Sequence, residues 1–149
     1  IWGQGEWGSE ETIKRARNDH TAKLRCVLGF SADLASKIYG GSDMFLMPSK
    51  FEPCGLSQLI AMRYGSVPIV RETGGLKDTV HPYNHATGEG NGLTFYSYNA
   101  YDMLDAVQRA VGLYRDYKGD WAKVVENGMT GDYSWAATAK KYEEIYENV

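Results

Sequence analysis

Short apolar runs alternate with helical patterns along the first two thirds of the chain, and this alternation constrains the fold more than any other feature. The runs are nearly continuous and are bounded by Gly, Asp or Pro: residues 24–28, 44–47, 67–70 and, more weakly, 92–95. Uninterrupted apolar runs of this length are typical of strands buried on both faces. Because helical segments separate them, we predict an α/β fold with a doubly wound parallel sheet, which binds ligands beyond the carboxyl ends of its strands.

Capping residues mark where the predicted helices begin and end. Ser31 precedes one helical pattern, and Gly65 follows the next at a position where a left-handed cap is expected. Asn99 and Ser134 precede two patterns near the end of the chain. We expect the apolar stripe of each of these two helices to pack inward: Leu104, Val107, Val111 and Tyr114 in one, and Trp135, Tyr142, Ile145 and Tyr146 in the other.

Composition narrows the function classes. Hydrophobic residues make up 43% of the 149 residues, enough for one domain with its own core, and the formal net charge is -3. Binding to a nucleic-acid backbone normally requires an excess of basic residues, and no apolar run here is long enough to cross a bilayer. The cysteines, Cys26 and Cys54, fit neither a disulfide framework nor a zinc site. We therefore expect a single cytoplasmic domain over residues 1–149, with no nucleic-acid or membrane partner.

Residues 3–8 match the GxGxxG spacing of a dinucleotide-binding turn. The helix that follows begins with Glu10 and Glu11, whose carboxylates compete with a pyrophosphate for the same helix end. The next predicted strand also ends in residues 29–31, Gly-Phe-Ser, and lacks the acidic residue that would bind a ribose. We therefore favour a plain strand-to-helix turn over a nicotinamide or flavin site.

The loop after the apolar run 44–47 carries an acidic residue, Glu52, followed by Pro-Cys-Gly at residues 53–55. Proline fixes the turn, glycine lets a ligand approach the backbone, and free N–H groups at the start of the next helix face outward. Such main-chain donors bind the hydroxyls and phosphates of a sugar nucleotide, while Glu52 would accept a sugar hydroxyl or face a cationic transition state. Alternatively, Glu52 is a solvated loop acid and Cys54 a small buried filler. The residues alone leave both interpretations open.

A second glycine loop, residues 71–78, follows the apolar run 67–70. Successive N–H groups at Gly74 and Gly75 would form an anion-binding concavity on the same edge of the sheet, although a single glycine-rich turn is also common without a ligand. The histidines show no metal-ligand spacing, and no nucleophile elbow is present. We therefore expect no metal and no other cofactor.

The stretch 42–80, SDMFLMPSKFEPCGLSQLIAMRYGSVPIVRETGGLKDTV, closely resembles the C-terminal domain of bacterial glycogen synthases and plant starch synthases. Residues 1–5, 90–111 and 133–146 are similar to further segments of the same family, so the resemblance spans essentially the whole chain. It implies the Rossmann-like C-terminal lobe of a retaining GT-B glycosyltransferase. Such enzymes transfer glucose from a nucleotide sugar, usually ADP-glucose, to the non-reducing end of an α-1,4-glucan without a metal.

The resemblance also implies roles for individual residues. Glu52 would be the catalytic residue at the donor glucose, and the other implied residues bind the donor: Cys54 and Gly55 at the glucose, Leu56 and Ser57 through amides at the diphosphate, Thr73, Gly74 and Gly75 in the second loop, and Phe30 beside the adenine. Related retaining transferases often carry a second Glu eight positions after the first, where this chain has Ile60. Glycogen and starch synthases lack that Glu as well.

Measured against this family, we expect the chain to be incomplete. The implied lobe would lack its first strand, and the N-terminal lobe that carries most of the α-glucan acceptor site would be absent. We therefore expect the chain alone to be inactive. UDP-glucose stays open as the donor in place of ADP-glucose. Two alternative functions also remain open: a non-catalytic nucleotide-binding or regulatory module, and a related sugar-nucleotide enzyme, such as sucrose synthase or another GT-B transferase. Cys54 and Gln58 argue against the second, because many of those relatives have Phe and Glu there. A plant source would change the expected compartment to the plastid.

Overall fold

The computed structural model describes residues 1–3 and 5–148, and the chain divides into two compact units, Ile1–Ile38 and Tyr39–Val149. In the first unit, strand β1 (Trp2–Gly3) pairs in parallel with β2 (Val27–Leu28), and helix α1 (Trp7–Asp19) connects them. Helix α2 (Ala32–Gly41) follows and runs into the second unit.

Strand β2 is shorter than the predicted run 24–28. The preceding residues form a turn in which the N–H groups of Lys23 and Leu24 donate to the carbonyl of His20. The Arg25 guanidinium donates to the carbonyls of Thr21 and Leu24, so these two carbonyls are engaged within the turn. The strand therefore begins only at Val27.

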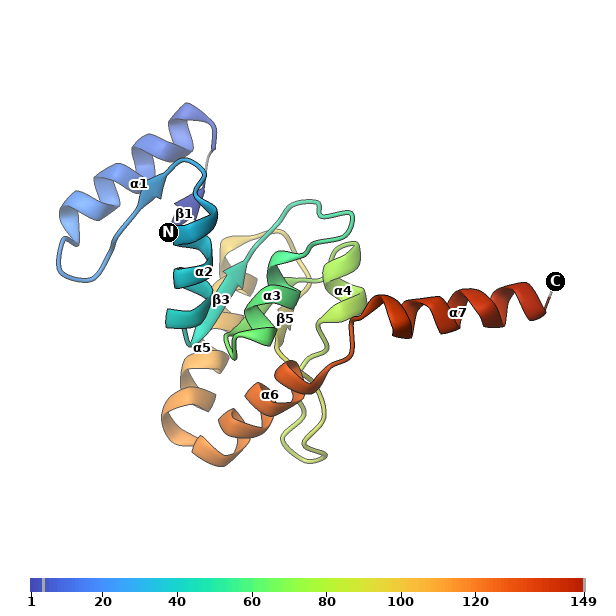
Figure 1. Ribbon diagram of the computed structural model, residues 1–149. Helices are drawn as coiled ribbons and strands as arrows, with labels where there is room; N and C mark the ends of the chain where they lie inside the picture. The colour runs from blue at the N-terminus through green and yellow to red at the C-terminus, as the bar shows by residue number, and fades with distance from the viewer. Residues whose placement is uncertain (4, 149) are drawn as a thin grey trace. The chain divides into compact units, whose positions relative to one another are not determined.

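The second unit contains a three-stranded parallel sheet in the order β3-β4-β5 (Figure 1). Its strands are β3 (Met44–Met47), β4 (Val67–Arg71) and β5 (Leu93–Phe95). Met44 pairs with Val67, and Ile69 pairs with Leu93. The central strand β4 is almost entirely buried, as its continuous apolar sequence predicts. The predicted α/β fold with a parallel sheet is therefore confirmed.

Helices cover both faces of this sheet (Figure 1). Helices α3 (Ser57–Arg63) and α4 (Gly75–Thr79) pack on the face that carries Val70, and α5 (Ala100–Asp116) and α6 (Lys118–Thr130) pack on the face that carries Val67 and Ile69. Within the part of the chain that the structure describes, no helix has both the length and the apolar character needed to cross a membrane.

Helix α5 begins where predicted, because the Asn99 side chain accepts a hydrogen bond of 2.8 Å from the amide of Asp102. The predicted inward stripe is shifted, however. The fully buried residues are Ala106 and Ala110, whereas Leu104 is 51% exposed. Small side chains let the helix axis approach the sheet, so they occupy the centre of the contact, and Val107, Val111 and Tyr114 are only partly buried.

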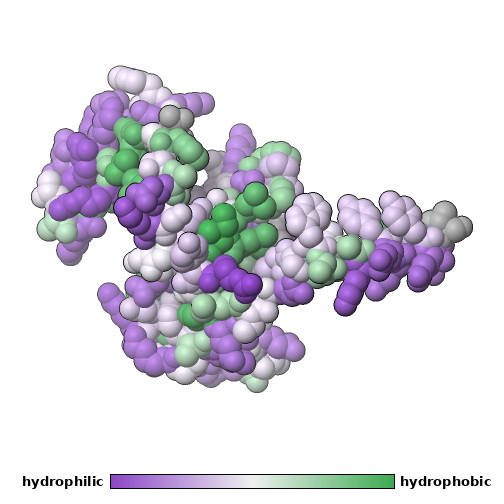
Figure 2. Space-filling model, viewed as in Figure 1, coloured by the Kyte–Doolittle hydropathy of each residue, from purple (hydrophilic) through white to green (hydrophobic). Residues whose placement is uncertain are grey.

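The last helix, α7 (Trp135–Glu147), also begins at its predicted cap, since Ser134 Oγ accepts from the amide of Ala137. Its aromatic stripe does not pack inward. Trp135 is 86% exposed and Tyr146 76% exposed, and Tyr142 and Ile145 are exposed as well. Figure 2 shows α7 pale along one edge and purple along the other, as its aromatic and charged residues require. The predicted inward packing of this stripe is therefore wrong for the described residues.

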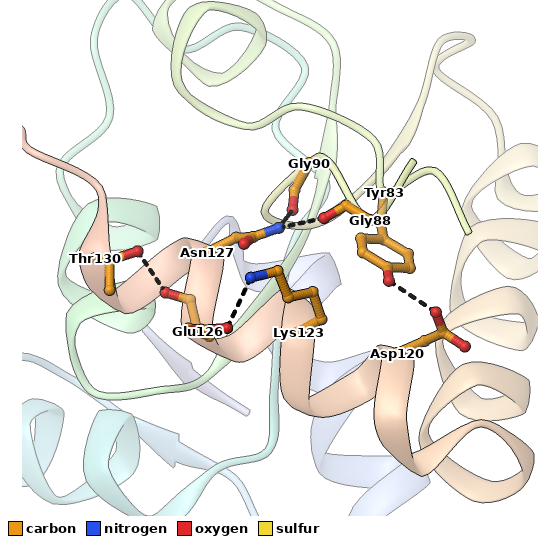
Figure 3. A network of polar contacts seen from close by, with 8 residues as sticks. All are labelled: Tyr83, Gly88, Gly90, Asp120, Lys123, Glu126, Asn127 and Thr130. Carbon is orange, nitrogen blue, oxygen red and sulfur yellow. Dashed lines mark hydrogen bonds and ion pairs between the residues drawn. The ribbon is translucent and has the colours of Figure 1, made fainter. Parts of the chain in front are cut away.

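Polar contacts hold the loop between α4 and β5, residues 80–92, against α6 (Figure 3). Asn127 Nδ2 donates to the carbonyls of Gly88 and Gly90 at 2.9 and 2.8 Å. The Tyr83 hydroxyl donates to Asp120 Oδ1 at 2.8 Å. Burial first, and then this hydrogen bond, raise the pKa of the Tyr83 phenol. The loop is therefore anchored at both of its ends by side-chain contacts to one helix.

Replacing Asn127 should show how much this anchoring contributes. Asn127→Ala removes the donor to two loop carbonyls, and we expect it to lower the free energy of unfolding by about 1–3 kcal/mol. Urea unfolding followed by circular dichroism would measure the change. Lys123→Ala on the same helix removes only the exposed ion pair with Glu126, and should cost less than about 1 kcal/mol. Equal losses in the two variants would contradict the anchoring role.

Candidate functional site

Two loops meet at the carboxyl ends of β3 and β4, where the sequence predicts a ligand site. The amide of Gly75 donates to the carbonyl of Pro53 at 3.3 Å. A side chain at Gly74 would collide with the main-chain carbonyl of Glu52, and one at Gly75 would collide with that of Cys54. Only glycine therefore permits this approach, and the structure brings the two predicted loops into direct main-chain contact.

The first loop presents unused main-chain donors. Among the described residues, no acceptor receives a hydrogen bond from the backbone amides of Cys54, Gly55, Leu56 or Ser57. Gly55 has a φ of +72°, which turns the chain sharply before α3 begins. Consecutive free amides on a turn of this kind bind anions or hydroxyl oxygens. The loop can therefore donate several hydrogen bonds to a polar ligand.

Glu52 lies directly before these amides and is half-buried. Its carboxylate makes no hydrogen bond or ion pair with any residue that the structure describes. Glu72 in the second loop differs, because its carboxylate accepts from the Thr94 hydroxyl at 2.8 Å. Glu52, unlike Glu72, is thus available to a ligand. Cys54 is exposed and Thr73 is half-buried in the same region.

Arg71 holds the approach to Glu52 in place, a role that its position at the head of the second loop did not predict. From the end of β4, its Nε donates to the carbonyl of Ser49 at 2.9 Å, and Nη2 donates to that of Lys50. Its Nη1 donates to the carbonyl of Tyr96 at 3.3 Å. The only feature of the sequence that sets Arg71 apart is its charge at the end of an otherwise buried apolar strand. Arg71 therefore cross-links the ends of all three strands.

Gln58 links the two loops from the interior of the second unit. This side chain is fully buried, and its Nε2 donates to the carbonyl of Gly55 at 2.7 Å and to Thr79 Oγ1 at 3.1 Å. The Thr79 hydroxyl in turn donates to the carbonyl of Gly75 at 2.7 Å. The sequence offered one signal for Gln58, namely a polar residue beside the apolar run 59–62 on α3.

The first unit carries the remaining predicted residue, Phe30, which is 81% exposed just after β2. Its role beside an adenine stays a prediction. In the glycine turn at residues 3–8, the amide of Gly5 donates to Glu10 Oε1 at 3.2 Å, so a carboxylate of the chain itself engages this turn. Gln4 of that motif lies outside the described residues.

A hollow in the second unit does not coincide with these loops. It has a volume of about 530 Å³ and lies between the C-terminal part of α3 and residues 128–134, with Arg63 and Tyr133 in its lining. Arg63 donates to the carbonyl of Met129 there, which links α3 to α6 beside the hollow. The free main-chain donors at residues 54–57, and not cavity size, identify the candidate site.

Comparisons with known proteins identify the family to which this chain belongs. The sequence model of the family described as glycosyl transferases group 1 matches residues 1–121. The chain is 50% identical over 149 residues to a glycogen synthase of Desulfitobacterium hafniense and 55% identical to one of Clostridium novyi. These matches cover the whole chain but only 32% and 31% of the two relatives, so the chain spans about a third of their length.

The solved catalytic domain of starch synthase IV from Arabidopsis thaliana, bound to ADP and acarbose, has the same fold. It matches with a TM-score of 0.84 and 36% identity over 98% of this chain and 31% of that one. The Rossmann-like fold of a GT-B glycosyltransferase lobe is confirmed, whereas the missing first strand and the missing second lobe stay predictions. The chain belongs to the glycosyl transferases group 1 family.

Proposed function

We propose that this chain forms much of the donor site of a glycogen or starch synthase. The enzyme transfers glucose from ADP-glucose to the non-reducing end of an α-1,4-glucan with retention of configuration. The observation that carries this proposal is the row of free amides at residues 54–57 beside the unengaged carboxylate of Glu52. The choice of reaction is supported by glycogen synthases that are 50% and 55% identical to this chain, and by the ADP-bound starch synthase with the same fold.

In this proposal the free amides bind the donor along its length. The amides of Leu56 and Ser57 donate to the diphosphate oxygens, and those of Cys54 and Gly55 donate to hydroxyls of the glucose. Thr73 and the turn at Gly74–Gly75 line the other side of the donor. When the bond between the glucose C1 and the diphosphate breaks, ADP leaves with the electron pair. Amide dipoles already fixed in position then stabilise the growing negative charge.

Glu52 acts on the sugar side of the same bond. As the bond to ADP weakens, positive charge develops on the glucose ring, and a carboxylate nearby stabilises it. The acceptor hydroxyl forms the new bond to C1 on the face that ADP leaves, and its proton passes to an oxygen of the departing diphosphate. Because Glu52 has no partner among the described residues, its charge is not already neutralised by an ion pair.

Partners and location follow from the same proposal. The donor is ADP-glucose in preference to UDP-glucose, because the related starch synthase IV was solved with ADP. The α-glucan acceptor binds mainly outside this chain. The reaction as proposed needs no metal and no other cofactor, and takes place in the cytoplasm, or in the plastid of a plant.

A paired measurement tests this function. Transfer of radiolabelled glucose from ADP-glucose to glycogen would be followed in the full-length gene product, and ADP binding would be measured by calorimetry. Transfer together with ADP binding supports the proposal. Binding of ADP without any transfer would instead support a non-catalytic nucleotide-binding module, and the absence of both would overturn the proposed site.

Glu52→Ala should separate catalysis from binding. We expect kcat and kcat/KM to fall together by about a hundredfold or more, because the carboxylate acts mainly in the transition state. The affinity for ADP should change little, since the amides that bind the diphosphate remain. Asp78→Ala, which removes an exposed acid of α4, is the matched control and should keep normal turnover. Unchanged glucan synthesis in Glu52→Ala would make Glu52 a solvated loop acid.

The cysteines offer a second check on the site. Cys54 is exposed and Cys26 is half-buried, so iodoacetamide should alkylate Cys54 first. Because Cys54 belongs to the proposed donor loop, saturating ADP should slow its alkylation and leave the rate at Cys26 unchanged. Peptide mass spectrometry over a time course would measure both rates. Faster labelling of Cys26, or equal rates at Cys54 with and without ADP, would contradict this placement.

A further inference from the structure

A partly buried chain of hydrogen bonds connects the two loops of the candidate site. It runs from the carbonyl of Gly55 to Gln58 Nε2, from there to Thr79 Oγ1, and on to the carbonyl of Gly75. The distances are 2.7, 3.1 and 2.7 Å. Gln58 is fully buried and Thr79 is partly buried, so the bond from Gln58 to Gly55 is shielded from water. The chain therefore couples the position of one loop to that of the other.

The bond to Gly55 also fixes the direction of a free amide. All peptide bonds of the described residues are trans, and in a trans peptide the C=O and the following N–H point in opposite directions. Because the Gly55 carbonyl points at Gln58, the N–H of Leu56 points away from the buried side chain. This amide has no acceptor among the described residues.

Core packing alone does not account for a glutamine at this position. Gln58 Oε1 is buried and has no hydrogen-bond partner among the described residues. An unpaired buried acceptor destabilises a fold, and an unbranched apolar side chain of similar length would fill the same space without it. The interaction that favours glutamine at this position is thus the pair of hydrogen bonds from Nε2 to Gly55 and Thr79.

We propose that Gln58 is a positioning residue that, through Thr79, locks the loop at residues 52–57 to the turn at Gly74–Gly75 and aims the Leu56 amide at the donor diphosphate. Gln58 itself touches no substrate. This inference rests on the proposed function for the identity of the ligand, but the orientation of the Leu56 amide can be tested without any ligand.

Gln58→Met removes both Nε2 donors and the unpaired oxygen while it keeps the length of the side chain. We expect the urea midpoint to change little, because the loss of the donors is offset by removal of the unpaired acceptor. The Leu56 amide signal should shift in nitrogen-15 spectra of the leucine-labelled, full-length gene product. The dissociation constant of ADP should rise roughly tenfold, because the Leu56 amide is no longer held in position to donate to the charged diphosphate.

Thr79 provides a matched pair of substitutions that keeps Gln58 and changes no residue of the first loop. Thr79→Val removes the hydroxyl in the middle of the chain of bonds, whereas Thr79→Ser keeps it. We expect Thr79→Val to reproduce the Leu56 shift and the weaker ADP binding, and Thr79→Ser to restore both. This pair decides the matter if Gln58→Met does not fold.

The outcomes separate the two proposals. If the unsubstituted protein does not bind ADP, the proposed function fails, and the Leu56 signal alone decides the role of Gln58. If ADP binds, but Leu56 and the ADP affinity are unchanged in Gln58→Met and in Thr79→Val, the positioning role is overturned. A lower urea midpoint with no change at Leu56 or in ADP affinity would likewise reduce Gln58 to a structural residue.

Discussion

The candidate site depends on the direct approach of two main chains, those of residues 52–54 and 74–75. No side chain lies between them, so the spacing of the loops is set by peptide groups alone. The contact is possible because β3 and β4 are neighbours in a parallel sheet and both end at this edge. Arg71 then cross-links the strand ends through backbone carbonyls, and the buried Gln58 side chain joins the two loops. The two loops thereby form one fixed array of donors.

The sheet beneath the site follows from the burial of β4. Its residues alternate between two cores, one shared with α3 and α4 and one shared with α5 and α6. Because both faces are covered, a shift of the strand by one residue would exchange the two sets of side chains, so the register is strongly determined. The same register places Arg71 opposite Phe95, where the loops begin. Packing in the core and geometry at the site are therefore linked through one strand.

Continuous apolar runs predicted the strands well where tertiary packing agrees with local sequence, as in 44–47 and 67–70. Periodicity also located the caps at Asn99 and Ser134. It could not tell which side chains of α5 lie at the contact, because close packing selected Ala106 over the larger Leu104. Helix α6 gives a weaker signal, since its buried stripe includes Gly128.

The same limit applies to the candidate site. Local motifs indicated both loops, because Pro, Gly and the neighbouring Glu52 act through short-range geometry. The part played by Gln58 depends on Thr79, which is 21 positions away and is brought near only by the completed fold. Likewise, nothing in the residues around Arg71 shows that its guanidinium meets the carbonyls of Ser49 and Tyr96. Sequence motifs therefore do not predict supporting residues that are far from the site in sequence.

Stability is unevenly distributed along this chain. No described residue of α1 is buried, and the aromatic stripe of α7 is exposed, whereas β4 and the helices beside it contain side chains with almost no solvent contact. Short helices of 13 residues gain little from backbone hydrogen bonds alone. Amide protons of α1 and α7 should thus exchange with solvent through local opening, while those of β4 exchange only when the second unit unfolds. A single melting temperature would describe that unit's core and would miss both helices.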